Sequence, residues 1–150
     1  MGIRQTHDYD AHGNLLRTRI QSADDQTAIT SETVWQSNGN YPASSTDARG
    51  NTVSKVIDSE SGLTQSVTDS NSQTVNYTYD ASRRVTGVQT TADGKNYKNA
   101  YTYEKDRIKT VSHNTTGDTA DVTYSFEYDA LGRKTSVKVG TQVLSTNVYG

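Results

Sequence analysis

VTYSFEYDALGR, residues 122–133, combines the pattern of a half-buried β-strand with that of a tight turn. Val122, Tyr124, Phe126 and Tyr128 fall on one face of a strand, and the polar residues Thr123, Ser125, Glu127 and Asp129 alternate with them on the other. In the Asp-x-x-Gly-Arg segment, the Asp side chain can accept a hydrogen bond from the backbone two residues on, and Gly supplies a positive φ. The chain is therefore predicted to reverse here, and a second strand is predicted to begin at Arg133.

The same strand and turn recur along the chain. Tyr77-Thr78-Tyr79-Asp80 leads into Arg83-Arg84, and Tyr101-Thr102-Tyr103-Glu104 leads into Asp106-Arg107. The lead tyrosines Tyr79, Tyr103 and Tyr128 stand 24 and 25 residues apart. A second reversal in each unit is predicted at residues 92–95, 116–119 and 139–141, so that each repeat has two strands and two turns.

One spacing departs from simple alternation. Val85 and Val88, like Ile108 and Val111, are three residues apart and would point to opposite faces of a regular strand. Either a β-bulge follows the turn, or the first residue of each pair still belongs to the turn.

Weaker copies of the turn extend toward the N-terminus. Tyr9-Asp10-Ala11-His12-Gly13-Asn14 and Asp47-Ala48-Arg49-Gly50-Asn51 keep the Asp-x-x-Gly frame, with Asn in the Arg position. Residues 1–74 are therefore predicted to be degenerate repeats and residues 75–150 well-matched ones, within a single continuous array. In the first part, residues 22–33 are predicted to form a polar loop, and Trp35 is predicted to be a core anchor for its strand.

The composition fits a β protein with thin apolar layers. Hydrophobic residues make up 31% of the chain, the mean hydropathy is −0.84 and the net charge is −2. Disorder requires a higher net charge, whereas Thr, Val and Tyr suit pleated strands. The chain has no apolar run long enough for a membrane helix, no signal-peptide core in residues 1–30, no cysteine, and no basic excess that would indicate nucleic-acid binding.

The repeats resemble the YD repeat of the Rhs, teneurin and Tc-toxin C-component families, which reads approximately Tyr-x-Tyr-Asp-x-x-Gly-Arg-Leu. Tyr128, Asp129, Gly132 and Arg133 match this frame, with Phe126 in the first aromatic position. The other two copies match at Tyr77, Tyr79, Asp80 and Arg84, where Arg83 replaces Gly, and at Tyr101, Tyr103 and Arg107, where Glu104 replaces Asp and the turn is shorter.

The resemblance implies an all-β fold in which tandem antiparallel β-hairpins form a curved, β-solenoid-like strip of a β-shell. It implies a non-catalytic segment of a shell that encapsulates or displays a polypeptide, as in toxin delivery by bacterial Rhs-type proteins. The implied partners are the rest of the shell and an enclosed toxin polypeptide, and the implied location is secreted or at the cell surface. The alternative is a cell-surface adhesion module that binds carbohydrate through its Tyr rows. The aspartyl autoprotease motif that ends bacterial shells is absent, so self-cleavage is not implied.

The hairpins also predict an association property directly. A hairpin exposes two edges and buries little surface alone, so repeats must stack on their neighbours. A terminal repeat then keeps an unpaired edge, and we expect self-association through β-edges.

No catalytic residue, metal ligand set or cofactor is predicted. His7, Asp8, Asp10 and His12 form the densest cluster of ligand-type residues, but Asp10 already has a turn role and nothing else completes a coordination set. The segment at 69–80 begins like a calcium loop but lacks its turn glycine, so an Asx-rich turn is predicted. His113 is expected in a hairpin loop.

The repeated arginines Arg84, Arg107 and Arg133 have two interpretations. They could form a ladder that binds anions. The favoured interpretation is that each Arg packs its stem on a Tyr ring and pairs with the repeat Asp or with a turn carbonyl.

Overall fold

The computed structural model describes residues 2–22, 28–92, 94–115 and 120–150. Within these ranges the chain forms thirteen strands and no helix, and the strand pairs are antiparallel, so the predicted all-β fold class is confirmed. The strands are β1 Ile3–Tyr9, β2 Leu15–Ser22, β3 Ala28–Trp35, β4 Pro42–Thr46, β5 Thr52–Ile57, β6 Thr64–Thr68, β7 Thr74–Tyr79, β8 Val85–Ala92, β9 Lys95–Glu104, β10 Arg107–Asn114, β11 Val122–Tyr128, β12 Lys134–Val139 and β13 Gln142–Thr146. None of the described elements is a helix that could cross a membrane.

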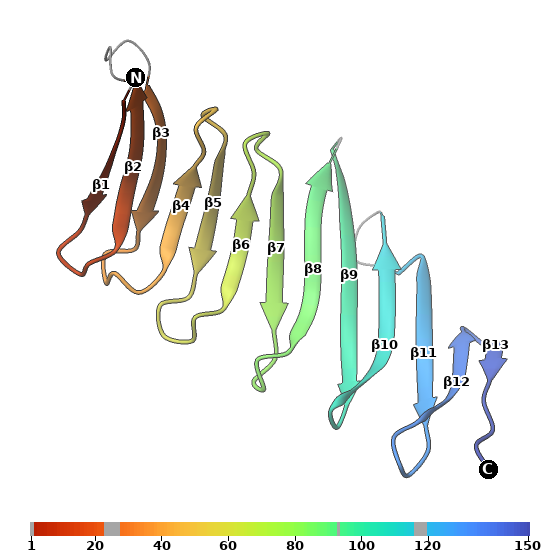
Figure 1. The fold of residues 1–150 in the computed structure, drawn as a ribbon. Coiled ribbons are helices and arrows are strands. Elements are labelled where there is room, and N and C mark those ends of the chain that lie inside the picture. Colours follow the sequence, from red (N-terminus) through yellow and green to blue (C-terminus); the bar gives the residue numbers. More distant parts are fainter. Residues whose placement is uncertain (1, 23–27, 93, 116–119) are drawn as a thin grey trace. The chain divides into compact units, whose positions relative to one another are not determined.

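The chain divides into two compact units, Met1–Thr74 and Val75–Gly150. In the first unit each strand from β1 to β6 pairs with the next one along the chain, and in the second unit the strands from β7 to β13 do the same (Figure 1). That the first unit holds degenerate repeats, the second well-matched ones, and both a single array, stays a prediction.

Aspartate side chains build the tight turns. Asp10, Asp47, Asp80 and Asp129 each accept a hydrogen bond from the backbone N–H four residues on, at 2.8 to 3.0 Å. The glycine of the frame has a positive φ, for example +82° at Gly132, and Arg83 takes φ +63° in the glycine position. The predicted turns therefore form by the predicted local chemistry. The turn at 69–73 is likewise an Asx turn, in which Asp69 accepts hydrogen bonds from Asn71 and Gln73.

The predicted bulge is confirmed. Thr78 pairs with Gly87 and Tyr79 pairs with Val85, so Thr86 is the extra residue directly after the turn. The β9–β10 pair has the same irregularity, where Ile108 pairs with Tyr103 but Thr110 pairs with Thr102. The bulge explains why the two apolar residues of each pair can be three apart.

The turn at Asp47 differs from the one at Asp10. Asp10 follows β1 and Asp47 follows β4, so the two turns lie at opposite ends of the antiparallel strands of the first unit. A bulge follows the Asp10 turn, whereas Thr46, Ser45 and Ser44 pair in register with Thr52, Val53 and Ser54. The Asp47 frame therefore marks the other reversal of a repeat.

The second reversals are confirmed where the structure describes them. Ala92 pairs with Lys95 and Val139 pairs with Gln142 across short connections. Residue 93 and the predicted turn at 116–119 lie outside the described residues, although β10 and β11 beside the latter pair antiparallel.

Two local predictions are wrong. The predicted loop at residues 22–33 ends earlier, because β3 begins at Ala28, and residues 23–27 lie outside the described part. His113 lies in β10 and not in a loop; its Nδ1 is 2.8 Å from Oδ1 of Asn99 on β9. Cross-strand pairing of polar side chains extends both strands beyond where the apolar pattern ends.

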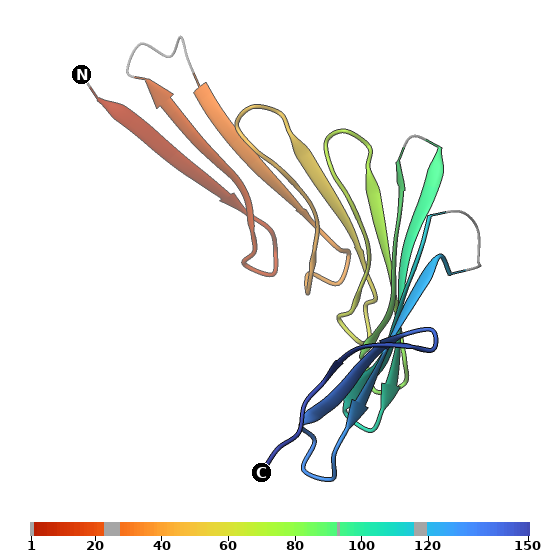
Figure 2. The ribbon, with the colours of Figure 1, turned by 90° about the vertical axis from the view of Figure 1, so that its right-hand side faces the viewer.

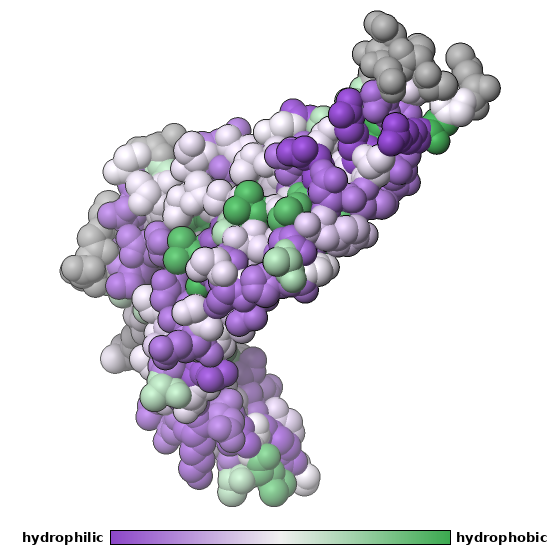
Figure 3. Space-filling model, turned by 90° about the vertical axis from the view of Figure 1, so that its left-hand side faces the viewer, coloured by the Kyte–Doolittle hydropathy of each residue, from purple (hydrophilic) through white to green (hydrophobic). Residues whose placement is uncertain are grey.

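The apolar residues form thin layers and no closed core. Among the described residues no hydrophobic side chain is fully buried, because each unit is a single layer of strands (Figure 2). Trp35, predicted as a core anchor, is only half-buried at the end of β3, and Tyr124 is 38% exposed. On the face drawn in Figure 3, apolar residues form small separate groups within a mostly polar surface.

Candidate functional site

The repeat arginine closes each turn onto its aspartate. Arg84 donates to Oδ2 of Asp80 from Nε at 2.8 Å and from Nη2 at 2.7 Å, and Arg133 Nε lies 2.7 Å from Oδ2 of Asp129. The guanidinium bond from Arg84 lowers the pKa of Asp80, and the backbone N–H of Arg133, followed by its guanidinium, lowers the pKa of Asp129. Both carboxylates are therefore held in the charged form.

The same guanidinium groups cover an aromatic ring of the next hairpin. The guanidinium carbon of Arg84 lies 4.2 Å from the centre of the Tyr103 ring, and that of Arg133 lies 4.3 Å from the Tyr149 ring. Arg107 lies farther from its ring, at 5.7 Å from Tyr128. These distances are those of cation–π stacking, which ties one hairpin to its neighbour.

Each of these tyrosines also bonds back to the preceding hairpin. Hydroxyl groups donate from Tyr103 to the carbonyl of Val85 at 2.6 Å, from Tyr128 to that of Ile108 at 2.8 Å, and from Tyr149 to that of Lys134 at 2.9 Å. Every acceptor directly follows the repeat arginine in sequence. We call this arrangement, a ring that faces the repeat Arg position and donates to the next carbonyl, the inter-hairpin aromatic contact.

The first unit contains the same contact with different residues. Trp35 Nε1 donates to the carbonyl of Leu15 at 3.0 Å, and Leu15 directly follows Asn14, which stands in the Arg position. The Asn14 amide donates to Oδ2 of Asp10 at 3.0 Å and to the carbonyl of Gly39 at 2.8 Å. Sequence analysis missed this role of Trp35. Its signal was the spacing, since Trp35 follows Tyr9 by 26 residues (35 − 9), close to the repeat length.

The remaining predicted repeat residues have varied surroundings. Tyr9 ends β1 and is 60% exposed, with its ring centre 6.4 Å from that of His7. Tyr77, Tyr79 and Tyr101 are half-buried in β7 and β9, Phe126 is half-buried in β11, and Gly13, Gly50 and Gly132 hold the left-handed positions of their turns. Asp47 is paired with the Asn51 amide at 2.9 Å in place of an arginine.

Arg107 lacks the carboxylate partner of the other repeat arginines. Glu104, which replaces the repeat Asp, lies 3.1 Å from Lys109 Nζ instead. The Arg107 guanidinium rests against Gly132 of the next turn, where an added Cβ would overlap it. Stacking on Tyr128 and on this glycine therefore holds Arg107 in place.

The cluster near the N-terminus is dispersed by the pleat of β1. His7 Nδ1 is 3.1 Å from Thr18 Oγ1, Asp8 lies 3.8 Å from Arg17, and His12 lies 3.8 Å from Asp10. No three of the described His, Asp and Glu side chains are grouped so that they could hold a metal ion.

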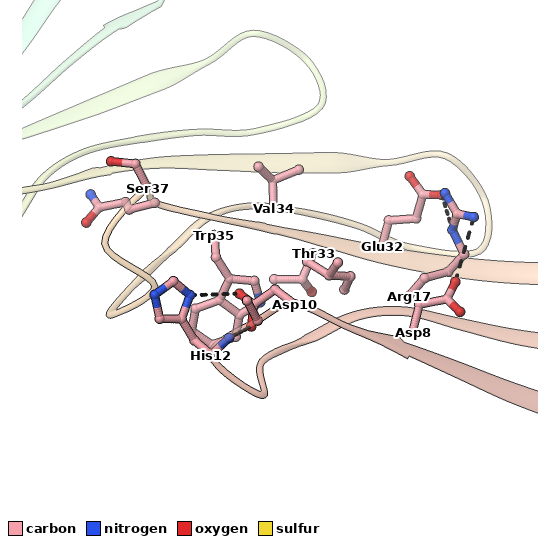
Figure 4. A pocket seen from close by; sticks show the side chains of 12 residues that line it. Asp8, Asp10, His12, Arg17, Glu32, Thr33, Val34, Trp35 and Ser37 are labelled. Carbon is pink, nitrogen blue, oxygen red and sulfur yellow. Dashed lines mark hydrogen bonds and ion pairs between the residues drawn. The ribbon is translucent and has the colours of Figure 1, made fainter.

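A hollow of about 690 Å³ lies over β1, β2 and β3 in the first unit (Figure 4). Its walls include Asp8, Asp10, Arg17, Glu32 and Trp35. Arg17 lies between two carboxylates, 2.8 Å from Glu32 and 3.8 Å from Asp8. The hollow therefore combines an aromatic ring with charged side chains of both signs.

Residues 59–95 match the family model of the RHS Repeat. This range holds β6, β7, β8 and the turn at Asp80, and it covers less than half of the chain. The resemblance noted from the repeat residues is thereby confirmed over this range. None of the curated proteins compared with the chain matches it.

Among solved structures, the chain is similar to the crystal structures of TcdB2-TccC3-TEV and of TcdB2-TccC3. The first is 15% identical over 93% of this chain, and the second is 14% identical over 95% of it, each with a TM-score of 0.29. This chain spans only 10% and 11% of the length of those chains.

Proposed function

From the RHS repeat that this chain carries at residues 59–95, we propose that it is a non-catalytic structural segment of a YD-repeat shell. The shell encapsulates or displays a polypeptide, as in toxin delivery by Rhs-type proteins. The rest of the shell and an enclosed toxin polypeptide are then its partners, and its location is secreted or at the cell surface.

The repeated inter-hairpin aromatic contact carries this proposal. Tyr103, Tyr128 and Tyr149 each join a hairpin to the one before it through a hydrogen bond and a stacked arginine. No fully buried hydrophobic side chain stands among the described residues, so stability comes from adding hairpins side by side. A wall built in this way is suited to enclosing a space and needs no active site.

A protease-protection assay on the full-length protein tests this function. The enclosed polypeptide should resist digestion in the native protein and become sensitive in Tyr128→Ala, which opens one contact. Leu131→Ala is the matched control, because Leu131 is 75% exposed on the turn beside Tyr128. If the full-length protein leaves every other segment equally open to protease, the enclosing role is wrong.

Carbohydrate binding through the Tyr rows is the competing function. Arg84 and Arg133 cover the rings of Tyr103 and Tyr149, the type of ring face that a sugar would need. The shell function therefore predicts no signal on a glycan array, whereas a signal lost in Tyr103→Ala would favour adhesion.

A further inference from the structure

Trp35 differs from the equivalent tyrosines in what lies over its ring. Arg84 covers Tyr103 and Arg133 covers Tyr149, but the residue in the Arg position before Trp35 is Asn14. The Asn14 amide is occupied by Asp10 and by the Gly39 carbonyl. Within the described ranges no Lys or Arg cation stacks on Trp35.

The surroundings of Trp35 carry an excess of negative charge. Asp8, Asp10 and Glu32 line the hollow, and Arg17 is the one arginine among its lining residues (Figure 4). The side chains of Asp8 and Glu32 are 61% and 47% exposed, so both are open to a ligand from solvent. Although partial burial opposes it, the hydrogen bonds from Asn14 and His12 lower the pKa of Asp10, so that this carboxyl is charged at neutral pH.

We propose that this hollow binds the guanidinium group of an arginine side chain from another polypeptide. The guanidinium stacks on the indole ring of Trp35 and pairs with the carboxylates of Asp10 and Glu32. Arg84 is the internal precedent, since it lies 4.2 Å from the Tyr103 ring and 2.7 Å from Asp80 in the equivalent position of another repeat. Indole is the strongest of the aromatic rings for such a contact.

The charge balance selects the guanidinium over a neutral ligand. Three carboxylates against one arginine leave the hollow with a formal charge of −2. A planar guanidinium can stack on the ring and hydrogen-bond a carboxylate at the same time, which a compact ammonium does less well. The inference does not depend on the shell function, because it rests on the first unit alone.

Tryptophan fluorescence tests the proposal directly, because Trp35 is the single tryptophan of the chain. Titration with N-acetyl-arginine methylamide should change the emission of Trp35 with saturation at about millimolar concentration, as expected for one stacked and exposed cation. The neutral analogue N-acetyl-citrulline methylamide should have no effect. Added salt should weaken the response to the arginine probe.

Two variants sharpen the test. Glu32→Gln removes a pairing carboxylate and should weaken binding several-fold, while Glu60→Gln, an exposed carboxylate outside the hollow, should leave it unchanged. Asn14→Arg places a guanidinium over Trp35 within the chain, so it should change the emission of the free protein and abolish the response to the probe. Circular dichroism checks that each variant keeps its strands.

Each contrary outcome overturns the proposal. No response to the arginine probe, or an equal response to citrulline, would exclude a guanidinium site. A response to methyl glycosides alone would make the hollow a sugar site. A response that persists unchanged in Glu32→Gln and in Asn14→Arg would place arginine binding elsewhere.

Discussion

One aspartate in each YD turn performs two tasks at the scale of the residue. One oxygen of Asp80 accepts the backbone N–H groups of Ser82 and Arg84, which fixes the turn, and the other accepts the Arg84 guanidinium. That guanidinium also reaches the carbonyl of Lys105 in the next turn. The charge of the aspartate therefore acts both within a hairpin and, through the arginine, between hairpins.

Acid should destabilise these turns. The pKa values of Asp80 and Asp129 lie below the ordinary 3.8 in the folded protein, so their stabilisation is fully present above pH 3.8 and is lost as pH falls through the lower folded value. The melting temperature should therefore drop in strong acid. Asp129→Asn keeps an acceptor for the turn but cannot titrate, so its melting temperature should be lower at neutral pH and change less on acidification. An equal acid dependence in the variant would contradict this origin.

Gly132 should tolerate alanine less well than a glycine in open space. Alanine at φ +82° costs about 1–2 kcal/mol in backbone strain, and its Cβ would also displace the Arg107 guanidinium from Tyr128. Gly140→Ala is the matched control in the same unit, with φ +55° and no neighbour near the added Cβ. Gly132→Ala should therefore lower the melting temperature more than Gly140→Ala. In an Arg107→Ala background the difference should shrink, and a difference that stays the same would rule out the displacement.

The hairpin with its bulge is the working element. The bulge after each YD turn offsets the strand by one residue, and the carbonyl that directly follows the repeat arginine lies at this point. The next hairpin supplies the aromatic side chain that donates to it. Each hairpin is therefore complete only when its successor is present.

Removing the tyrosine hydroxyl and removing the ring should have separable effects. Tyr103→Phe loses the bond to the Val85 carbonyl but keeps the ring under Arg84, so it should cost about 1 kcal/mol of unfolding free energy. Tyr103→Ala also loses the ring and should cost about 2–3 kcal/mol. Tyr128→Ala and Tyr79→Ala should lower thermal stability strongly for the same reason.

Chemical denaturation measures both steps, with Leu131→Ala as the exposed control. If Tyr103→Ala melts like the parent protein, the aromatic ring does not hold the hairpins together.

Local signals could be predicted from the sequence and inter-hairpin ones could not. The Asp129 turn was predictable because Asp and Gly act within four residues on their own backbone. Trp35 was mistaken for a core residue because its partner is a backbone carbonyl 20 residues away, and a carbonyl leaves no mark in the sequence. The Asp47 frame looked equivalent to Asp10 because the distinguishing bulge depends on strand register.

At the scale of the whole molecule, strand edges are the main exposed feature. β1 bounds the first unit and β13 bounds the second, and neither has a second partner strand among the described residues. β13 is exposed along its length, including Val143 at 50% and Leu144 at 51%. Natural sheets protect such edges with charge, proline or a covering segment.

The isolated chain should therefore self-associate through its edges. Its weight-average mass in sedimentation equilibrium should rise with protein concentration, and Val143→Lys should reduce the rise, because an edge lysine opposes strand addition. Thr141→Lys adds the same charge in the turn before β13 and is the control. A mass that stays that of a monomer at every concentration would show that the edges are protected.

The absence of any fully buried hydrophobic side chain from the described residues also governs how stability responds to temperature. The heat capacity of unfolding arises from apolar surface that becomes hydrated, and globular proteins average about 12–15 cal/mol/K per residue. A layer whose apolar side chains are already half-hydrated gains less new contact with water, so its heat-capacity change should fall below that average. The curve of free energy against temperature is then shallow, and the wall keeps nearly the same modest stability in the cold as in the warm.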